Sequence, residues 1–220
     1  MSGLRIEDLE LTVPGRVLLQ SGDLAVAEGE VVAVTGRSGS GKTSLLHCLA
    51  GITRPSAGAV WIGEDRLDVL SVHARAAVRL RRIGMVFQFA ELLPELNVLD
   101  NVTLPARLAG RGEDDARNRA CKLLTELGLA GKERQPATVL SGGEAQRVAI
   151  ARAMVNTPNV VLADEPTGAL DEENAQAVGM TLARLAREHG AAVIIATHDG
   201  ALADLADRRV ALTKGELVAA

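Results

Sequence analysis

Short apolar runs and helical patterns alternate along much of the chain. Three runs are apolar and rich in β-branched residues, as buried strands are: 31–35, 160–164 and 193–197. Three segments have the apolar spacing that is typical of helices: 42–50, 145–155 and 173–188. Because strands and helices alternate, the pattern predicts a mostly parallel sheet that helices cover on both faces.

Other parts of the chain have a different pattern. Residues 1–30 and 56–70 have alternating apolar positions and turn signals, which favour an antiparallel β portion, and 209–218 is a candidate hairpin around Lys214 and Gly215. An amphipathic helix is expected at 114–127, within a stretch that Pro94 and Pro105 punctuate. We therefore expect one α/β domain, 1–220. Its core comprises 1–88 and 156–220, and an inserted α-helical subdomain comprises 89–155.

The composition fits a single domain with an aliphatic core. Hydrophobic residues are 47% of the 220 residues, but the aromatic residues are only Trp61, Phe87 and Phe89. The net charge of −4 argues against an obligate nucleic-acid-binding protein. Cys48 and Cys121 form no CxxC pair, so neither a disulfide framework nor a zinc site is expected. The charged N-terminal residues and the short apolar runs predict neither a signal peptide nor a membrane-spanning helix.

Residues 36–43, Gly-Arg-Ser-Gly-Ser-Gly-Lys-Thr, fit the phosphate-loop pattern GxxxxGK[ST] between an expected strand and an expected helix. Glycines let successive backbone N–H groups point at phosphate oxygens, and the helix N-terminus adds positive partial charge. The segment predicts a nucleotide site with Lys42 on the β- and γ-phosphates and the Thr43 hydroxyl on Mg²⁺. The binding residues would be Gly36, Arg37, Ser38, Gly39, Ser40, Gly41, Lys42, Thr43 and Ser44. A glycine-rich turn that binds nothing is the weaker interpretation.

Two acidic residues stand at the end of the apolar run 160–164. Asp164 is placed to hold the hydration shell of Mg²⁺, and Glu165 to orient and deprotonate an attacking water. Pro166 predicts extended backbone angles for Glu165, because proline restricts the residue before it. The alternative is an acidic strand end that merely faces solvent. Together with the phosphate loop, the pair predicts a P-loop NTPase core, which fits kinases, GTPases and many ATPases, and the segment that decides among them is 140–147.

Residues 140–144 read Leu-Ser-Gly-Gly-Glu. Ser141 and Glu144 have the spacing of a capping box, so a helix is expected to begin there. Gly142 and Gly143 leave its N-terminus bare of side chains, as at an anion-binding site. Simple capping would explain the serine and the glutamate but not the two glycines.

These segments follow one another in an order that resembles the ATP-binding subunits of ABC transporters, over nearly the whole chain. The order is the phosphate loop at 36–43, Gln88, the signature at 140–144, Asp164 with Glu165, Asp171 and His198. The resemblance implies that Gln88 senses Mg²⁺ and the lytic water, that Asp171 crosses a dimer interface, and that His198 contacts the γ-phosphate. The residues alone also allow a buried amide, a helix N-cap and a structural histidine, respectively.

The resemblance further implies a homodimer with ATP at the interface. Ser141, Gly142, Gly143 and Glu144 of one subunit would cover the nucleotide that the phosphate loop of the other subunit holds. ATP binding would close the dimer, and hydrolysis would allow it to reopen.

Residues 82–102 and 162–168 are similar to the lipoprotein-release, macrolide-export and antimicrobial-peptide-resistance branch of this family. That similarity implies an ATPase that powers a separate membrane permease, from the cytoplasmic side and peripheral to the inner face of the plasma membrane. We expect the permease to contact 88–99. There Phe89, Leu92 and Leu93 would form either an apolar docking patch or part of the helical core.

One departure from the family concerns the adenine base. The family usually has an aromatic residue ahead of the phosphate loop, but the matching position is near Val13 and no aromatic residue precedes Trp61. We therefore expect weaker ATP binding and looser base selection, with Arg16 as the candidate replacement. Separately, a basic cluster is expected to be a solvated helix face or, alternatively, a lipid or permease contact: Arg75, Arg79, Arg81 and Arg82.

Two other functions stay open at this point. A non-transport ABC ATPase in cell-envelope signalling or division would carry the same motifs, because the difference lies in its partner. An ABC ATPase that acts on nucleic acid or the ribosome typically has a coiled-coil insert or tandem cassettes, and this acidic chain has neither.

Overall fold

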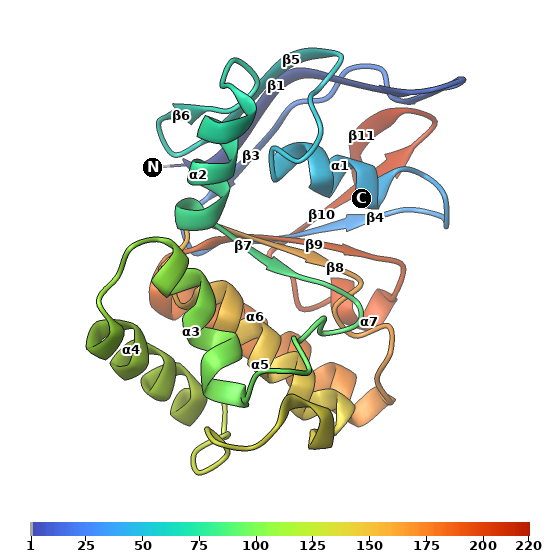
Figure 1. Ribbon diagram of the computed structural model, residues 1–220. Helices are drawn as coiled ribbons and strands as arrows, with labels where there is room; N and C mark the ends of the chain where they lie inside the picture. Colours follow the sequence, from blue (N-terminus) through green and yellow to red (C-terminus); the bar gives the residue numbers. More distant parts are fainter. Residues whose placement is uncertain (1) are drawn as a thin grey trace.

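The computed structural model describes residues 2–220, which form two sheets and a layer of helices (Figure 1). The strands are β1 (Ser2–Val13), β2 (Arg16–Leu19), β3 (Leu24–Ala27), β4 (Val31–Thr35), β5 (Ala57–Ile62), β6 (Asp65–Arg66), β7 (Ile83–Val86), β8 (Val160–Asp164), β9 (Ala192–Thr197), β10 (Arg208–Thr213) and β11 (Glu216–Ala219). The helices are α1 (Lys42–Leu49), α2 (Val72–Arg82), α3 (Val98–Leu108), α4 (Glu113–Glu126), α5 (Gly142–Met154), α6 (Glu172–His189) and α7 (Gly200–Ala203), with a 3₁₀ turn at Ala137–Val139.

The central sheet has the strand order β11-β10-β4-β9-β8-β7. Its neighbouring strands are parallel except in the hairpin of β10 and β11. In the turn of this hairpin, Lys214 and Gly215 have φ values of 51° and 79°, and positive φ at both residues is typical of a type I′ turn. The prediction of a mostly parallel sheet is confirmed.

Both faces of the central sheet are covered. Successive residues of a strand point to opposite sides of the sheet, so neighbouring residues belong to different hydrophobic cores. Val31 and Val193 belong to one hydrophobic core, which they share with α5 and α6. Val32 and Ile194 belong to the other core, which they share with α1. All four side chains are fully buried. This arrangement explains why β4 and β9 are apolar at every position before their last residue, a threonine, and do not alternate with polar residues.

The antiparallel sheet covers α1 from the side opposite the central sheet (Figure 1). β1 pairs with β2, β3 and β5, and β6 pairs with β5, all antiparallel. Leu4 and Ile6 of β1 share a hydrophobic core with Leu45 and Leu49 of α1. The antiparallel β portion predicted from 1–30 and 56–70 is therefore confirmed.

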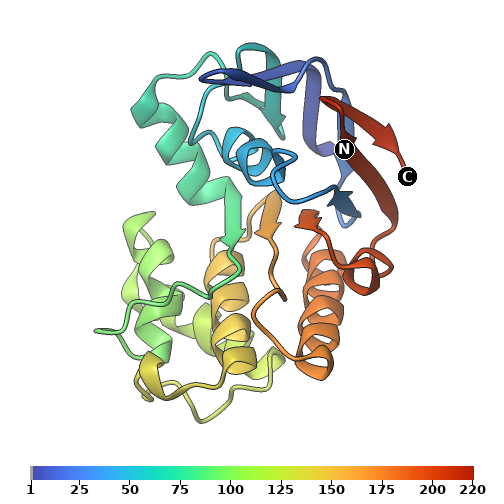
Figure 2. The same ribbon diagram turned by 90° about the vertical axis from the view of Figure 1, so that its right-hand side faces the viewer.

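Helices α3 to α6 lie on the other face of the central sheet (Figure 2). Among them, α3 packs against both α4 and α5. It begins at the N-cap Asn97, whose side chain accepts from the Asp100 N–H, and it contains Pro105. Proline usually ends a helix, so the sequence pattern did not predict α3, and packing against its neighbours overrides the local preference.

The arginines of α2 do not form one solvated face, so that prediction was wrong in part. Arg75 is buried, Arg79 donates to the carbonyl oxygens of Ala50 and Gly51, and Arg82 pairs with Asp65 at 3.0 Å. Arg81 alone of the four is exposed. The helix packs by its basic side because the stems of arginine side chains are apolar, and the head groups of Arg79 and Arg82 find partners nearby.

Candidate functional site

The phosphate loop joins β4 to α1, as the sequence predicts. Gly41 is the N-cap of α1 and has a φ of 108°, in a region that L side chains rarely adopt. Lys42 is only 8% exposed, and its ammonium donates to the Gly36 carbonyl oxygen at 2.9 Å. This contact folds the lysine side chain back over the loop. Its charge therefore lies where the loop's N–H groups would gather phosphate oxygens.

Glu165 lies directly beside the phosphate loop. Its Oε1 is 3.5 Å from the Lys42 ammonium and 2.9 Å from His198 Nδ1. Its Oε2 accepts from the Thr197 hydroxyl at 3.2 Å and from the His198 N–H at 3.3 Å. Because β8 and β9 are adjacent parallel strands, their carboxyl ends bring Glu165 and His198 together. Both carboxylate oxygens are thus oriented.

The backbone of Glu165 is not extended, so the prediction made from Pro166 was wrong. Its φ is 45°, in the left-handed region that residues other than glycine rarely adopt. The Glu165 N–H donates to Ala196 O at 2.8 Å, and the Gly168 N–H donates to Glu165 O at 3.0 Å. These bonds hold a tight turn at the end of β8, which sets the angle against the local preference. Such strain is typical of functional sites.

A groove of about 620 Å³ runs along the phosphate loop. Its lining residues come from five parts of the chain: Val13, Arg16, Leu18, Ser38, Gly39, Ser40, Gly41, Lys42, Thr43, Ser44, Gln88, Glu165 and His198. Gln88 follows β7 and is exposed, so the alternative of a buried amide is wrong. Val13 and Arg16 flank the turn between β1 and β2 at the groove. The groove therefore combines the phosphate loop with the residues expected at an adenine and at a lytic water.

The residues around Asp164 suit a hydrated Mg²⁺. Oδ1 of Asp164 is buried and has no hydrogen-bond partner among residues 2–220, which is costly unless a ligand or water supplies one. Thr43 and Gln88 line the groove, as does Glu165, the residue that follows Asp164. No cluster of three or more His, Cys, Asp or Glu residues with metal-binding geometry occurs in that described part of the chain. One carboxylate, a hydroxyl and phosphate oxygens are the kind of ligand set that Mg²⁺ takes in nucleotide sites.

The signature segment begins α5 with the predicted capping box. The Ser141 hydroxyl accepts from the Glu144 N–H at 3.3 Å, and the Glu144 carboxylate accepts from the Ser141 N–H at 3.0 Å. The Lys132 ammonium also donates to the Glu144 carboxylate. The bond from Lys132 and then the one from Ser141 lower the pKa of Glu144 from 4.5 to about 2. Lys132 therefore holds the first turn of α5 in place through Glu144.

This ion pair predicts a pH-dependent stability. Because the folded pKa of Glu144 lies below the unfolded value, its contribution is present above pH 4.5 and is lost as the pH falls toward 2. We expect Glu144→Gln to lower Tm at neutral pH. The difference in Tm from the original chain should shrink as the pH falls from 4.5 toward 2. Thermal unfolding across pH measures this.

The matched control is Glu113→Gln, since Glu113 lies in the first turn of α4 and forms no salt bridge within residues 2–220. A Tm difference for Glu144→Gln that does not change with pH would contradict the assignment.

The signature glycines lie against the start of α6. A Cβ atom on Gly143 would be 2.7 Å from Asn174 Oδ1, closer than real Cβ contacts come. Asn174 is held in turn by Asp171, the N-cap of α6, which accepts from the Asn174 N–H at 2.9 Å. That bond lowers the pKa of Asp171. The helix-capping interpretation of Asp171 thus describes its contacts within one chain.

The predicted site residues form two separate groups within one chain. The first group surrounds the groove and comprises the phosphate loop, Gln88, Glu165 and His198. The second comprises the signature segment and Asp171, and none of these residues lines the groove. Residues 140–144 could therefore reach a nucleotide in the groove of another chain, but they do not line the groove of their own.

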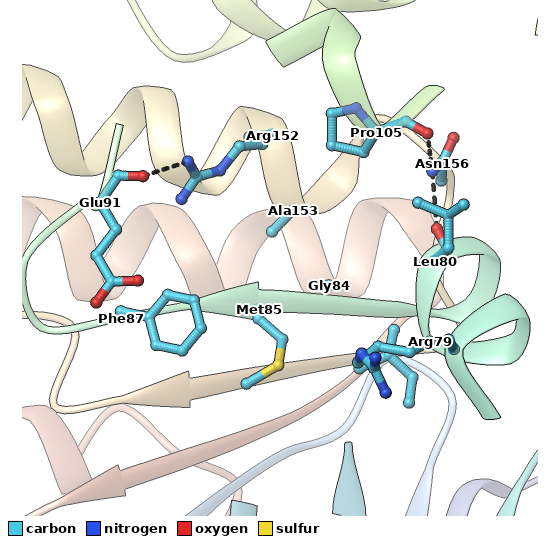
Figure 3. A pocket seen from close by; sticks show the side chains of 12 residues that line it. Arg79, Leu80, Gly84, Met85, Phe87, Glu91, Pro105, Arg152, Ala153 and Asn156 are labelled. Atoms are coloured by element: carbon cyan, nitrogen blue, oxygen red, sulfur yellow. Dashed lines mark hydrogen bonds between the residues drawn. The ribbon is translucent and has the colours of Figure 1, made fainter. Parts of the chain in front are cut away.

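A second groove, of about 510 Å³, lies between α2, β7 and α5 (Figure 3). Arg152 of α5 donates to the carbonyl oxygens of Ala90 and Glu91, at 2.7 and 2.6 Å, and burial lowers the pKa of its guanidinium. These bonds fix the start of the segment 88–99, in which Phe89 and Leu93 are exposed. Leu92 instead packs partly against the core. The docking-patch interpretation thus fits Phe89 and Leu93, and the core interpretation fits Leu92.

Sequence reasoning missed three residues that support the site: Thr197, Lys132 and Asn174. Each acts through a hydrogen bond to a predicted residue that is distant in sequence or lies across a turn. No spacing rule signals the pairs that Thr197 and Lys132 form, whereas Asn174 stands three residues after the N-cap Asp171, a spacing that could have indicated it.

Among residues 2–220, no helix combines the length and the apolar character that a membrane crossing requires.

Comparison with known proteins identifies the family. The ABC transporter family model matches residues 19–168. The chain is 44% identical over 203 residues to the lipoprotein-releasing system ATP-binding protein LolD of Hyphomonas neptunium, covering 91% of this chain and 88% of that protein. It is similar to the dimeric structure of the ABC transporter cassette MJ0796, with a TM-score of 0.86, 35% identity and coverage of 97% and 96% of the two chains. A post-hydrolysis dimer of the same cassette, bound to ADP and Pi, has a TM-score of 0.85, 33% identity and the same coverage. On this evidence the chain belongs to the ABC transporter family.

Proposed function

We propose that this chain is the ATP-hydrolysing subunit of a transporter and drives a separate membrane permease of the lipoprotein-release type. The observation that carries the proposal is the position of Glu165, whose carboxylate lies between the phosphate-loop residue Lys42 and His198. A carboxylate beside a phosphate-binding loop is suited to act as a general base on a water that attacks the γ-phosphate.

In this proposal each groove residue has a separate role in ATP hydrolysis. Backbone N–H groups of 38–44 and the Lys42 ammonium bind the phosphates, and Lys42 offsets the charge that develops in the transition state. Glu165 accepts the proton of the attacking water, Gln88 orients that water, and His198 contacts the γ-phosphate. Mg²⁺ would be held by Thr43, by Gln88 and, through water, by Asp164, and it would supply positive charge that offsets the charge of the phosphates.

We further propose that the working unit is a homodimer with ATP between the subunits. Support comes from the separation of the two residue groups and from the dimeric cassette to which the chain is similar. The bare N-terminus of α5, at Ser141, Gly142 and Gly143, would bind the γ-phosphate on the partner's phosphate loop. Glu144 holds that helix end through its capping box, and Asp171 lies beside it to cross the interface.

The adenine base would stack on no aromatic ring in this chain. Val13 lines the groove and is 37% exposed, with Arg16 next to it. Because stacking of a base on an aromatic side chain is worth about 1–3 kcal/mol, we expect Val13→Tyr to tighten ATP binding about tenfold. Titration with a fluorescent ATP analogue and with its GTP counterpart measures the gain and the base preference. Val17→Tyr is the control, since Val17 is exposed on β2 but does not line the groove. An equal gain from both variants would contradict the assignment.

We place the permease on the segment 88–99 and the groove beside it. Phe89 and Leu93 offer exposed apolar side chains, and Arg152 ties the start of this segment to the helix that carries the signature. We propose that residues 89–155 act as a helical subdomain on a core of 1–88 and 156–220, so that movement at the permease reaches Ser141. The chain would then be cytoplasmic and peripheral to the inner face of the plasma membrane, with no nucleic-acid partner.

The experiment is co-purification from solubilised membranes with Mg-ATP. Glu165→Gln should bind ATP without hydrolysing it and so hold the closed dimer on its partner. Lys42→Ala is the control, because it removes the phosphate contact while the docking segment stays intact. Recovery of a polytopic membrane protein with the first variant and less with the second supports transport. A cell-division or signalling membrane protein in its place would favour the non-transport alternative, and ribosomes or nucleic acid would overturn the proposal.

A further inference from the structure

The end of β9 orients the carboxylate of Glu165 through Thr197. Thr197 is fully buried, and its Oγ1 lies 3.2 Å from Glu165 Oε2. The N–H of Asp199 donates to the same hydroxyl oxygen at 3.0 Å. A threonine hydroxyl has a single hydrogen, so with a lone pair already engaged by Asp199 that hydrogen is directed to Glu165.

The position of Thr197 is rigid because it belongs to the central sheet. In the sheet register Thr197 pairs with Thr35 of β4, and its neighbour Ala196 pairs with Asp164 of β8. Ala196 also accepts the backbone N–H of Glu165 at 2.8 Å. Glu165 is thus attached to the end of β9 by its main chain and by its side chain, and these contacts sustain its left-handed backbone.

We propose that Thr197 is the positioning residue for the general base, a role that rests on the proposed function of Glu165. The other side chains at this carboxylate, Lys42 and His198, both line the groove, where bound phosphate would compete for them. Thr197 does not line the groove, so nucleotide leaves its bond to Glu165 intact. Its hydroxyl therefore fixes one carboxylate oxygen and aims the other at the attacking water.

The test compares Thr197→Val, which removes the hydroxyl, with Thr197→Ser, which keeps it. We expect Thr197→Val to lower kcat about 10- to 100-fold, since a misaimed base costs that much, and to leave the Kd for ATP within about twofold. Thr197→Ser should restore most of the rate. Thr103→Val is the matched control, because Thr103 is also a buried threonine, with its hydroxyl bonded to Asp100 O on α3. That variant should keep the kcat of the original chain.

A double-mutant cycle separates positioning from a general loss of structure. In the Glu165→Gln background, Thr197→Val should lower the single-turnover rate no further, because residues that act as a unit are not additive. An equal loss in both backgrounds, an unchanged kcat for Thr197→Val, or a serine variant as slow as the valine variant would overturn the inference. If Glu165→Gln itself hydrolyses ATP at the rate of the original chain, the proposed role of Glu165 is overturned, and the positioning role of Thr197 with it.

Discussion

Replacement of Glu165 by glutamine should lower the kcat for ATP hydrolysis about 10²- to 10⁴-fold, the range that general-base catalysis contributes. Glutamine keeps the size of the side chain but cannot accept the proton of the attacking water. The phosphate contacts of Lys42 and the loop stay in place, so ATP should still bind. Steady-state phosphate release gives kcat, and titration of a fluorescent ATP analogue gives Kd.

The control for this variant is Glu173→Gln, which removes a carboxylate from the exposed first turn of α6. This control variant should keep the kcat for hydrolysis and the Kd for ATP of the original chain. If Glu165→Gln retains more than about a tenth of the original kcat, another group takes the proton and the assignment of the base is wrong.

Two variants that are inactive alone should restore hydrolysis when mixed. Lys42→Ala removes the phosphate contact in the groove. Gly143→Asp places a carboxylate at the signature helix end, where it repels phosphate and where even its Cβ would lie 2.7 Å from Asn174 Oδ1. In a mixed dimer one site combines both defects, and the other pairs an intact phosphate loop with an intact signature. Random pairing in a two-fold dimer therefore predicts about a quarter of the original rate.

The mixture is prepared by incubating both chains without nucleotide, so that subunits exchange, and hydrolysis is then followed after ATP is added. The control mixes Lys42→Ala with a chain that carries both substitutions, because no pairing then contains an intact phosphate loop. Activity in the control, or a mixture no faster than its components, would show that the signature does not act in trans.

The local motifs of this protein follow from its sequence. The strand 31–35, the glycine-rich turn and the helix from Lys42 are consecutive, and each is set by residues within a few positions of it. The same is true of the capping box of Ser141 and Glu144 and of the hairpin turn at Lys214 and Gly215. Such features depend on backbone preferences and short-range hydrogen bonds, which the order of residues specifies directly.

Only the tertiary structure decided how these motifs meet. Hydrogen bonding to β9 holds Glu165 in the left-handed region, although Pro166 alone favours extended angles. Packing of α2 buries Arg75 in a face that the charge pattern predicts to be solvated. The separation of the signature segment from the groove likewise depends on how α5 and α6 pack. These outcomes arise from contacts between residues far apart in the chain. Their energies override local preferences, because packing and hydrogen bonds between distant segments outweigh the weak preferences of single residues.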